Sequence, residues 1–567
     1  MSYKLFKIMK FIYIGTLLGV ASTMFLSLDP DKTKQAAKNA EIIINSDNLL
    51  QQNTFDEFLG INSVRERDHS RINDQYQVAR YHRIFGMDSY LFTGEEIVTE
   101  WKGKRCRIDR SIPHDEYPND KMGFNPAKGG GGFDFDRFLK EMKDSGLQSI
   151  PVLARNLLYT NVPKDSMMNV WQIPWDEGGN PENPMDYKAY ASFLYQFTAR
   201  YGTNKLKEEG GTIDSKLLKL APNNEIKAGL NLVFAIEPGN EMDKDWFSKR
   251  EMATPKILAA FLSAAIDGHM GQMGDGHGIL TADPSMKIAF PSPIDIKSDF
   301  VLEVLEELKS MRSNASQYGK SVFPEENLIL TAHGYPFKVD SQSGKETSDI
   351  VENTEMISKS REFVQTLRSK YTCPIYLTET GYDKVVGDVS PIGAPTIPAD
   401  SMDSDEVSTF AQAKHITRLL MSMYGAGYDK TFLFTLKDPV AIEASGFRTK
   451  FSTSGLIRKN GKKDLAWHIV QYLGKQLAGY TLEYAYFKGP LSIMRLHHGD
   501  KVAFIYWMGT NNNSSTKMEL PVKNYYSKVN EIVLADYNGG YQSNCIDMKK
   551  SVEIEITEFP RLVMLEP

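Results

Sequence analysis

The chain has 567 residues, which exceeds the size at which a single hydrophobic core stops growing and therefore favours two domains. Its 41% hydrophobic and 24% charged residues are ordinary for a soluble protein, with no extreme in either direction. The formal net charge of -6 disfavours nucleic-acid binding, because neutralising phosphates requires a basic surface. Three cysteines lie far apart without a CxxC pair, which predicts free thiols and disfavours zinc-ribbon and redox sites.

Residues 1–30 have the composition of a signal peptide or N-terminal anchor. Lys4, Lys7 and Lys10 precede an apolar run over residues 11–28, which is the order found in secretory signals. We therefore expect a secreted, periplasmic or cell-surface protein. The run is also about the minimum length for a membrane span, so the protein would meet a membrane only if this segment stays uncleaved.

Residues 31–54 are a polar lead-in with an early strand-like burst, and residues 55–463 alternate between strand and helix patterns. Eight short apolar segments predict strands at 58–62, 77–84, 149–154, 230–237, 287–292, 328–335, 374–380 and 431–436. Amphipathic segments predict helices at 133–146, 187–202, 254–268 and 410–427. Eight such units predict an α/β fold with a closed (β/α)8 barrel, also called a TIM barrel.

A doubly wound sheet is the alternative for this region. It requires a glycine-rich phosphate turn directly after its first strand, and the segment that follows residue 62 has none. The glycine run at 129–132 precedes a helix but does not directly follow a strand, so it predicts a loop.

Residues 464–567 contain strands without long helices and predict a β-sandwich domain. Strand-like runs lie at 480–487, 492–499, 501–509, 516–522, 530–538 and 551–559. Turn signals at 511–515 and 538–540 separate some of them. The early strand near residues 41–45 is expected to join this sandwich.

Acidic residues follow two of the predicted barrel strands, where the active sites of such barrels lie. The fourth strand runs into IEPGNE, which supplies Glu237, Asn240 and Glu241, and the seventh ends in LTETG, which supplies Glu379. Two facing carboxyl groups can cleave a glycosidic bond, one protonating the leaving oxygen and the other attacking the anomeric carbon or activating water. Glu237 is expected to support the site and not to catalyse.

The ordered motifs IEPGNE, HGY and YLTETG together resemble glycoside hydrolase clan A, the retaining (β/α)8 hydrolases. The barrel followed by a sandwich is similar to families 30, 39 and 79 of that clan. The resemblance implies Glu241 as acid/base and Glu379 as nucleophile. It also matches His333 and Tyr335 to the clan's strand-6 His-x-Tyr and Arg80 to its strand-2 arginine.

One position departs from the clan. Many members carry a tryptophan at the end of strand 8, whereas this chain reads TFLFTLKD. Either Phe434 or an aromatic residue from a loop is expected to replace it.

Further candidates surround the two acids. Asn240 can bond a sugar 2-hydroxyl, and Trp246 can stack on a sugar ring. Additional candidates for the pocket are Trp171, Trp175, Asn156, Lys437 and Asp438. The sandwich residues His497 and His498 are expected at the surface.

The sequence therefore predicts a retaining glycoside hydrolase that cleaves a β-linked oligo- or polysaccharide through a covalent glycosyl-enzyme. No cofactor, metal or stable protein partner is expected, and the repeated DGH at 267–269 and 275–277 fits no known metal-ligand spacing. A barrel that binds glycan without cleaving it is the alternative, and a metal-dependent barrel hydrolase is a third reading.

Overall fold

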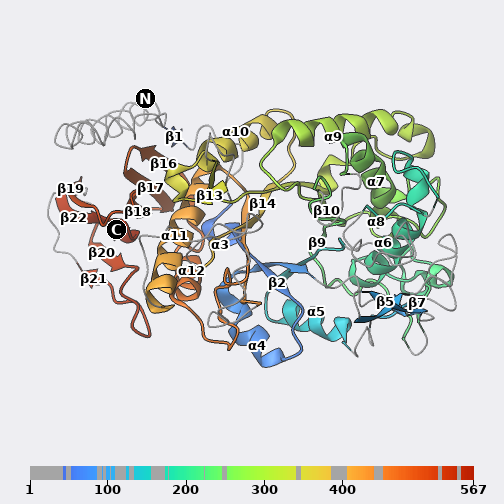
Figure 1. Cartoon of the computed structure of the whole chain (residues 1–567), viewed down its shortest axis with the longest axis horizontal. Coiled ribbons are helices and arrows are strands. Elements are labelled where there is room, and N and C mark those ends of the chain that lie inside the picture. The colour runs from blue at the N-terminus through green and yellow to red at the C-terminus, as the bar shows by residue number, and fades with distance from the viewer. Residues whose placement is uncertain are drawn as a thin grey trace.

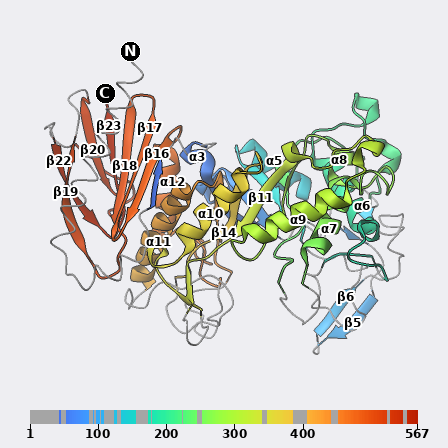
Figure 2. The same ribbon diagram turned by 90° about the horizontal axis from the view of Figure 1, so that it is seen from above.

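The computed structural model contains a parallel barrel and, beside it, antiparallel sheets (Figure 1 and Figure 2). The structure describes residues 42–45, 53–85, 92–93, 97–101, 104–108, 123–126, 133–154, 173–176, 178–221, 224–244, 252–339, 346–384, 405–439, 451–521, 526–545 and 551–567. In this part of the chain no helix is long and apolar enough to cross a membrane. The predicted signal or anchor at 1–30 lies outside the described residues.

Eight parallel strands form the barrel, in the order β8-β3-β2-β15-β14-β11-β10-β9. Each predicted strand is present, as β2 Leu59–Val64, β3 Tyr81–Phe85, β8 Gln148–Pro151, β9 Ala235–Ile236, β10 Lys287–Ala289, β11 Leu328–His333, β14 Ile375–Thr380 and β15 Lys430–Leu433. Backbone hydrogen bonds from Phe234 to Ser149 and from Leu153 to Glu237 join the two end strands. The predicted barrel is thereby confirmed.

A helix follows every barrel strand and covers its outer face. These helices are α4 His69–Asp74, α5 Phe135–Asp144, α6 Lys188–Tyr201, α7 Pro255–Asp267, α9 Ser298–Met311, α10 Met356–Arg368, α11 Asp405–Ala426 and α12 Leu465–Gln476. The ends of α7 follow directly from sequence. The Thr254 hydroxyl accepts from the Ile257 N–H at 3.3 Å, Pro255 occupies the first turn, and Gly268 closes the helix at φ 63°.

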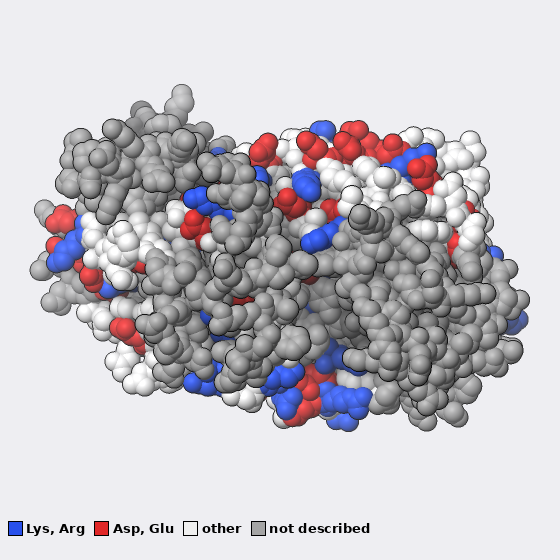
Figure 3. Space-filling view, in the orientation of Figure 1, with Lys and Arg blue, Asp and Glu red and all other residues white. Residues whose placement is uncertain are grey.

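Shorter elements fill the connections between these units. They are the helices α3 Phe55–Phe58 and α8 Ile279–Ala282, and three two-stranded sheets that pair β4 Phe92–Thr93 with β7 Gly123–Phe124, β5 Ile97–Trp101 with β6 Lys104–Ile108, and β12 Phe337–Val339 with β13 Glu346–Ser348. Acidic side chains gather over α9 on the face shown in Figure 3. This helix carries Glu303, Glu306 and Glu307.

The C-terminal domain is a seven-stranded antiparallel sheet with a two-stranded layer on one face. The sheet has the order β1-β16-β17-β18-β23-β20-β21, and β19 pairs with β22. Their bounds are β1 Ile42–Asn45, β16 Thr481–Lys488, β17 Leu491–His498, β18 Lys501–Met508, β19 Ser515–Pro521, β20 Lys528–Val533, β21 Asn544–Cys545, β22 Ser551–Thr557 and β23 Arg561–Glu566. The early strand β1 pairs with β16, so it lies in this sheet.

Both faces of the seven-stranded sheet are buried, as alternation along β18 shows. Phe504 and Tyr506 pack in the cluster that contains Ile554 and Ile556 of β22. Ile505 and Trp507 point to the opposite face and belong to the larger cluster that also contains residues of α11 and α12, and Trp507 donates its indole N–H to Glu352 at 2.6 Å. The sandwich therefore packs directly against the outside of the barrel, beside α11 and α12 (Figure 2).

The floor of the barrel is an apolar layer of inward-pointing side chains, to which seven strands contribute. Its members are Tyr81, Ile150, Ala235, Ala289, Ile329, Tyr376 and Phe432. The remaining barrel strand, β2, contributes Gly60 to this layer. The position has no room for a side chain, because a Cβ there would lie 2.5 Å from the Phe432 ring. The layer closes the barrel below the polar residues described next.

We predict that Gly60→Ala destabilises the protein by about 1–3 kcal/mol, because the added methyl overpacks the floor against Phe432. Urea unfolding followed by circular dichroism measures the change. Gly540→Ala is the matched control, because no atom lies within 4 Å of a Cβ built there. Equal midpoints for the two variants would contradict the packing of this layer.

Candidate active site

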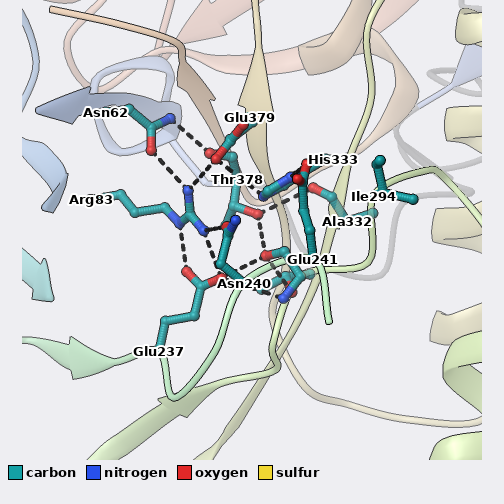
Figure 4. A network of polar contacts seen from close by, with 12 residues as sticks. Asn62, Arg83, Glu237, Asn240, Glu241, Ile294, Ala332, His333, Thr378 and Glu379 are labelled. Carbon is teal, nitrogen blue, oxygen red and sulfur yellow. Dashed lines mark hydrogen bonds and ion pairs between the residues drawn. The ribbon is translucent and has the colours of Figure 1, made fainter. Parts of the chain in front are cut away.

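Polar side chains from strands far apart in the sequence meet at the carboxyl ends of the barrel strands (Figure 4). Glu237, Asn240 and Glu241 follow β9, His333 ends β11, and Glu379 lies near the end of β14. The structure thus brings together the predicted pair of acids and three of their predicted neighbours, including Tyr335, which bonds Glu379.

The Arg83 guanidinium is the centre of this cluster and is fully buried. Its Nε and Nη2 bind both oxygens of Glu237 at 2.6 and 2.8 Å. Nη1 donates to Asn62 Oδ1 at 3.0 Å and to Glu379 Oε1 at 2.7 Å, and Nη2 also donates to Asn240 Oδ1 at 2.6 Å. All five N–H donors of the guanidinium are therefore engaged.

The prediction that Arg80 lies in the site is wrong. Arg80 precedes β3, at the end of the barrel opposite the acids, where its exposed side chain pairs with Glu57. Along β3 the inward positions are Tyr81, Arg83 and Phe85, so the arginine near the carboxyl end of the strand reaches the acids. Period-two alternation from Tyr81 would have identified Arg83, but the predicted strand began four residues too early.

Glu241 is held by a backbone that is uncommon for a residue with a side chain. Its φ is 48°, in the left-handed region, and its N–H donates to Ser292 O at 2.8 Å. His333 Nδ1 lies 2.7 Å from Glu241 Oε1. Burial lowers the pKa of His333 to about 4, so this imidazole is neutral at pH 7.

Glu379 is buried within the cluster, and only 5% of its surface is exposed. One oxygen accepts from Arg83 and the other accepts from the Tyr335 hydroxyl at 3.0 Å. Burial raises the pKa of Glu379, and the positive charge of Arg83 opposes that rise. Both contacts favour the ionised carboxylate, which is the form that acts as a nucleophile.

Glu241, His333 and Glu379 place one side-chain donor atom each within 4.8 Å of the others. By distance alone these three atoms could hold a cation. However, His333 Nδ1 already bonds Glu241, and the fixed positive charge of Arg83 lies 2.7 Å from Glu379 Oε1. The positive charge of Arg83 therefore disfavours a bound cation at this position. It favours two carboxyl groups that act together in one reaction.

Phe434 directly follows β15, at the strand end where the sequence motifs would lead one to expect the tryptophan of clan A. Its ring packs edge-on against Phe85 at 6.2 Å and against Phe451 at 4.8 Å between centroids. Phe451 also contacts the Tyr335 ring at 5.4 Å. An aromatic wall thus stands beside the acids, built from two strand ends and one loop.

Several other predicted residues lie elsewhere or outside the described part of the chain. Trp246, Trp171 and Asn156 are not among the described residues. Trp175 packs against the core of the barrel. Asp438 is buried against Lys384 at 2.8 Å and so does not line the mouth.

Remaining predictions concern residues away from the site. Lys437 is half-buried and His498 is exposed. In the first DGH, Asp267 pairs with Arg312 at 2.8 Å. Cys373 and Cys545 are free thiols. Sequence reasoning missed Asn62, and it missed Arg83 because the predicted strand began before Tyr81.

Solved structures of glycoside hydrolases share this fold. A family 39 enzyme from the gut symbiont Bacteroides cellulosilyticus WH2 aligns with a TM-score of 0.51 at 10% identity, over 90% of this chain and 82% of that chain. The GH39 enzyme from Xanthomonas axonopodis pv. citri aligns with a TM-score of 0.52 at 13% identity, over 92% and 96%. No family model and no curated sequence matches the chain. The expected barrel with a C-terminal sandwich is confirmed at the level of fold.

We predict that Arg83→Met destabilises the protein by about 3–5 kcal/mol, because it leaves the buried carboxylate of Glu237 without a cation. The double variant Arg83→Met/Glu237→Met is expected to recover part of this loss, since it removes the stranded charge. Equilibrium unfolding in urea measures both effects. A single variant as stable as the parent would contradict the role assigned to the buried ion pair.

Proposed function

We propose that this protein is a retaining glycoside hydrolase in which Glu379 is the nucleophile and Glu241 is the acid/base. The proposal depends on one observation above all, the approach of carboxylate oxygens of Glu241 and Glu379 to within 4.8 Å at the barrel mouth. Retaining glycosidases hold their carboxyl groups about 5–5.5 Å apart, whereas inverting enzymes leave about 6.5–9.5 Å for a water molecule. The spacing in this chain supports retention.

The contacts of each acid suit its proposed step. Glu379 attacks the anomeric carbon while Glu241 gives its proton to the leaving oxygen. In the second step Glu241 takes a proton from water, and that water displaces Glu379 from the sugar. Neutral His333 can orient the Glu241 carboxyl in both of its protonation states, because an imidazole nitrogen either donates or accepts a hydrogen bond.

Asn240 is the proposed contact for the sugar 2-hydroxyl. Its Oδ1 accepts from Arg83 at 2.6 Å, which fixes the amide plane and leaves the Nδ2 group to donate to substrate. A bond of this kind strengthens in the transition state of glycoside hydrolysis. The stacking role of Trp246 stays a prediction.

The proposed substrate is a β-linked oligo- or polysaccharide outside the cytoplasm. The linkage follows from the clan that the motifs resemble, and the location follows from the charged and apolar order of residues 1–30. A glycan-binding barrel without catalysis is the competing function. The intact pair of acids and the Arg83 contact to Glu379 favour catalysis.

We predict that Glu379→Gln lowers kcat on β-linked glycans by at least about 10³-fold, because the amide cannot form the covalent intermediate. Glu241→Gln is expected to lower it by about 10²–10⁴-fold, least on aryl glycosides whose leaving groups need no proton. Glu355→Gln, at an exposed carboxyl on the barrel surface, is the matched control.

Reducing-sugar assays on purified polysaccharides, repeated with EDTA, measure these effects. Unchanged turnover in Glu379→Gln would exclude the proposed mechanism. Loss of parental activity in EDTA, with recovery on adding a divalent cation, would favour the metal-dependent alternative. Binding without turnover in parent and variants alike would favour the glycan-binding alternative.

We predict that Tyr335→Phe shifts the acidic limb of the kcat/KM profile to higher pH. The Tyr335 hydroxyl donates to Glu379 Oε2 and so stabilises the carboxylate. Without this donor the pKa of Glu379 rises further, and protonation removes the nucleophile at a higher pH than in the parent. An acidic limb that stays in place, measured from pH 3 to 8, would exclude this contact as a determinant of the ionisation of Glu379.

A further inference from the structure

We propose that Asp243 is a positioning residue for Glu241, because it anchors the turn that carries Glu241 to the segment that follows β10. This inference rests on the proposed function and assigns one further residue to the same site. Three observations carry it, namely the left-handed backbone of Glu241, the two attachments of its turn to residues 292–294, and the attachment of that same segment to His333.

The backbone of Glu241 requires support from its surroundings. Its φ of 48° brings Cβ close to the following carbonyl oxygen, which is unfavourable for a residue with a side chain. Such a conformation persists only where neighbouring structure holds it in place. The Lys244 N–H donates to Glu241 O at 3.2 Å and closes the turn, and the Glu241 N–H donates to Ser292 O at 2.8 Å.

Asp243 provides the second attachment of this turn. Its half-buried carboxylate accepts from the Ile294 N–H, at 3.0 Å through Oδ1 and at 3.3 Å through Oδ2. Because this link and the link to Ser292 O have the same spacing along the chain, the turn and the segment lie side by side and run in the same direction. A hydrogen bond to a carboxylate is stronger than one to a neutral acceptor, so the loss of Asp243 would release a substantial part of this attachment.

The segment after β10 also fixes His333, the hydrogen-bond partner of Glu241. Pro293 O accepts from the His333 N–H at 3.0 Å, and the side chain of His333 places Nδ1 2.7 Å from Glu241 Oε1. Ser292 ties the segment to the centre of the site, because its buried hydroxyl donates to Glu237 Oε1 at 2.8 Å. One short segment therefore sets the positions of both partners in the bond between His333 and Glu241.

The nucleophile is held by different contacts. Glu379 accepts from Arg83 on one oxygen and from Tyr335 on the other. Release of Asp243 from Ile294 should therefore displace the acid while the nucleophile stays in place. A general acid acts only within hydrogen-bond reach of the oxygen that it protonates, and a displacement of about 1 Å can lower a rate about 10²-fold.

Kinetics of the full chain on two kinds of leaving group distinguish positioning of the acid from general support of the fold. 2,4-Dinitrophenyl β-glycosides need no proton donor, because dinitrophenolate is a stable leaving group, whereas β-linked oligosaccharides of the same sugar need one. The sugar is chosen from xylose, glucose, galactose, mannose and glucuronic acid as the one that the parent releases fastest. The measured constant is kcat/KM, because it reports the step in which the glycosidic bond is broken.

The variants separate the hydrogen bond from other effects of Asp243. Asp243→Ala removes the acceptor, and Asp243→Asn keeps an oxygen that can accept from the Ile294 N–H. Asp243→Glu keeps the carboxylate on a longer side chain, and it carries the comparison if the alanine variant does not fold. Asp295→Ala is the matched control, because this exposed carboxylate lies in the same segment and accepts from the N–H of the adjacent Ile296 at 2.8 Å.

We expect Asp243→Ala to lower kcat/KM about 10²-fold on oligosaccharides and less than about threefold on dinitrophenyl glycosides, which is the pattern expected for Glu241→Gln. Asp243→Asn should stay within about threefold of the parent on both, because it can keep the hydrogen bond. Asp243→Glu should show the same pattern as the alanine variant at a smaller size. Asp295→Ala should match the parent on both substrates.

Equal losses on both kinds of substrate in Asp243→Ala, or in Asp243→Glu where it replaces the alanine variant, would overturn the inference. Oligosaccharide turnover equal to that of Asp295→Ala would also overturn it. The proposed function stands in either case if Glu241→Gln shows the leaving-group pattern and Glu379→Gln abolishes turnover. If Glu241→Gln lacks that pattern, or if Glu379→Gln turns over substrate like the parent, the proposed function fails and the inference fails with it.

Discussion

The buried Arg83 guanidinium is the interaction on which the rest of the site depends. It binds Glu237 through two parallel hydrogen bonds and Glu379 through one, and it is enclosed completely by protein. Removing a charge from water is costly unless partners of good geometry satisfy it, and here every donor has such a partner. The guanidinium thereby joins barrel strands β3 and β14 to the segment after β9, and it sets where the carboxylates can lie.

The layers of the barrel separate stability from chemistry. The floor is apolar and tightly packed, and Gly60 leaves the space that the Phe432 ring occupies. Above it lies the polar layer around Arg83, and above that the aromatic wall. The sandwich packs against the outside of the barrel. There Glu352 accepts hydrogen bonds from Trp507 of the sandwich and, at 2.8 Å, from Arg418 of α11, so the sandwich is linked to α11 through Glu352. This arrangement keeps a charged site rigid because its supports are packed and paired.

The periodic parts of the fold could be predicted from the sequence, and the depth of individual side chains could not. Barrel strands are short apolar runs between amphipathic helices, so their number and order were accessible. Glu241 and Glu379 were accessible too, because acids directly after apolar strands stand out. Arg83 could not be distinguished from Arg80, because strand limits predicted from sequence are uncertain by a few residues and an offset of one residue moves a side chain to the other face of the strand.

Loop contributions were also beyond the reach of the sequence. The position of Phe451 beside Tyr335 depends on a buried carboxylate and on a left-handed backbone, and neither leaves a periodic signal.

The central claim is that Glu379 forms a bond to the sugar while Glu241 moves the proton. Incubation with an activated 2-deoxy-2-fluoro glycoside of the preferred sugar, followed by proteolysis and mass spectrometry, tests it most directly. The fluorine slows both steps, and the activated leaving group lets the glycosyl-enzyme form faster than water releases it. The account predicts a single glycosyl adduct on the peptide that contains Glu379. An adduct on Glu241 or on another residue, or hydrolysis of unmodified substrate with inversion at the anomeric carbon, would contradict it.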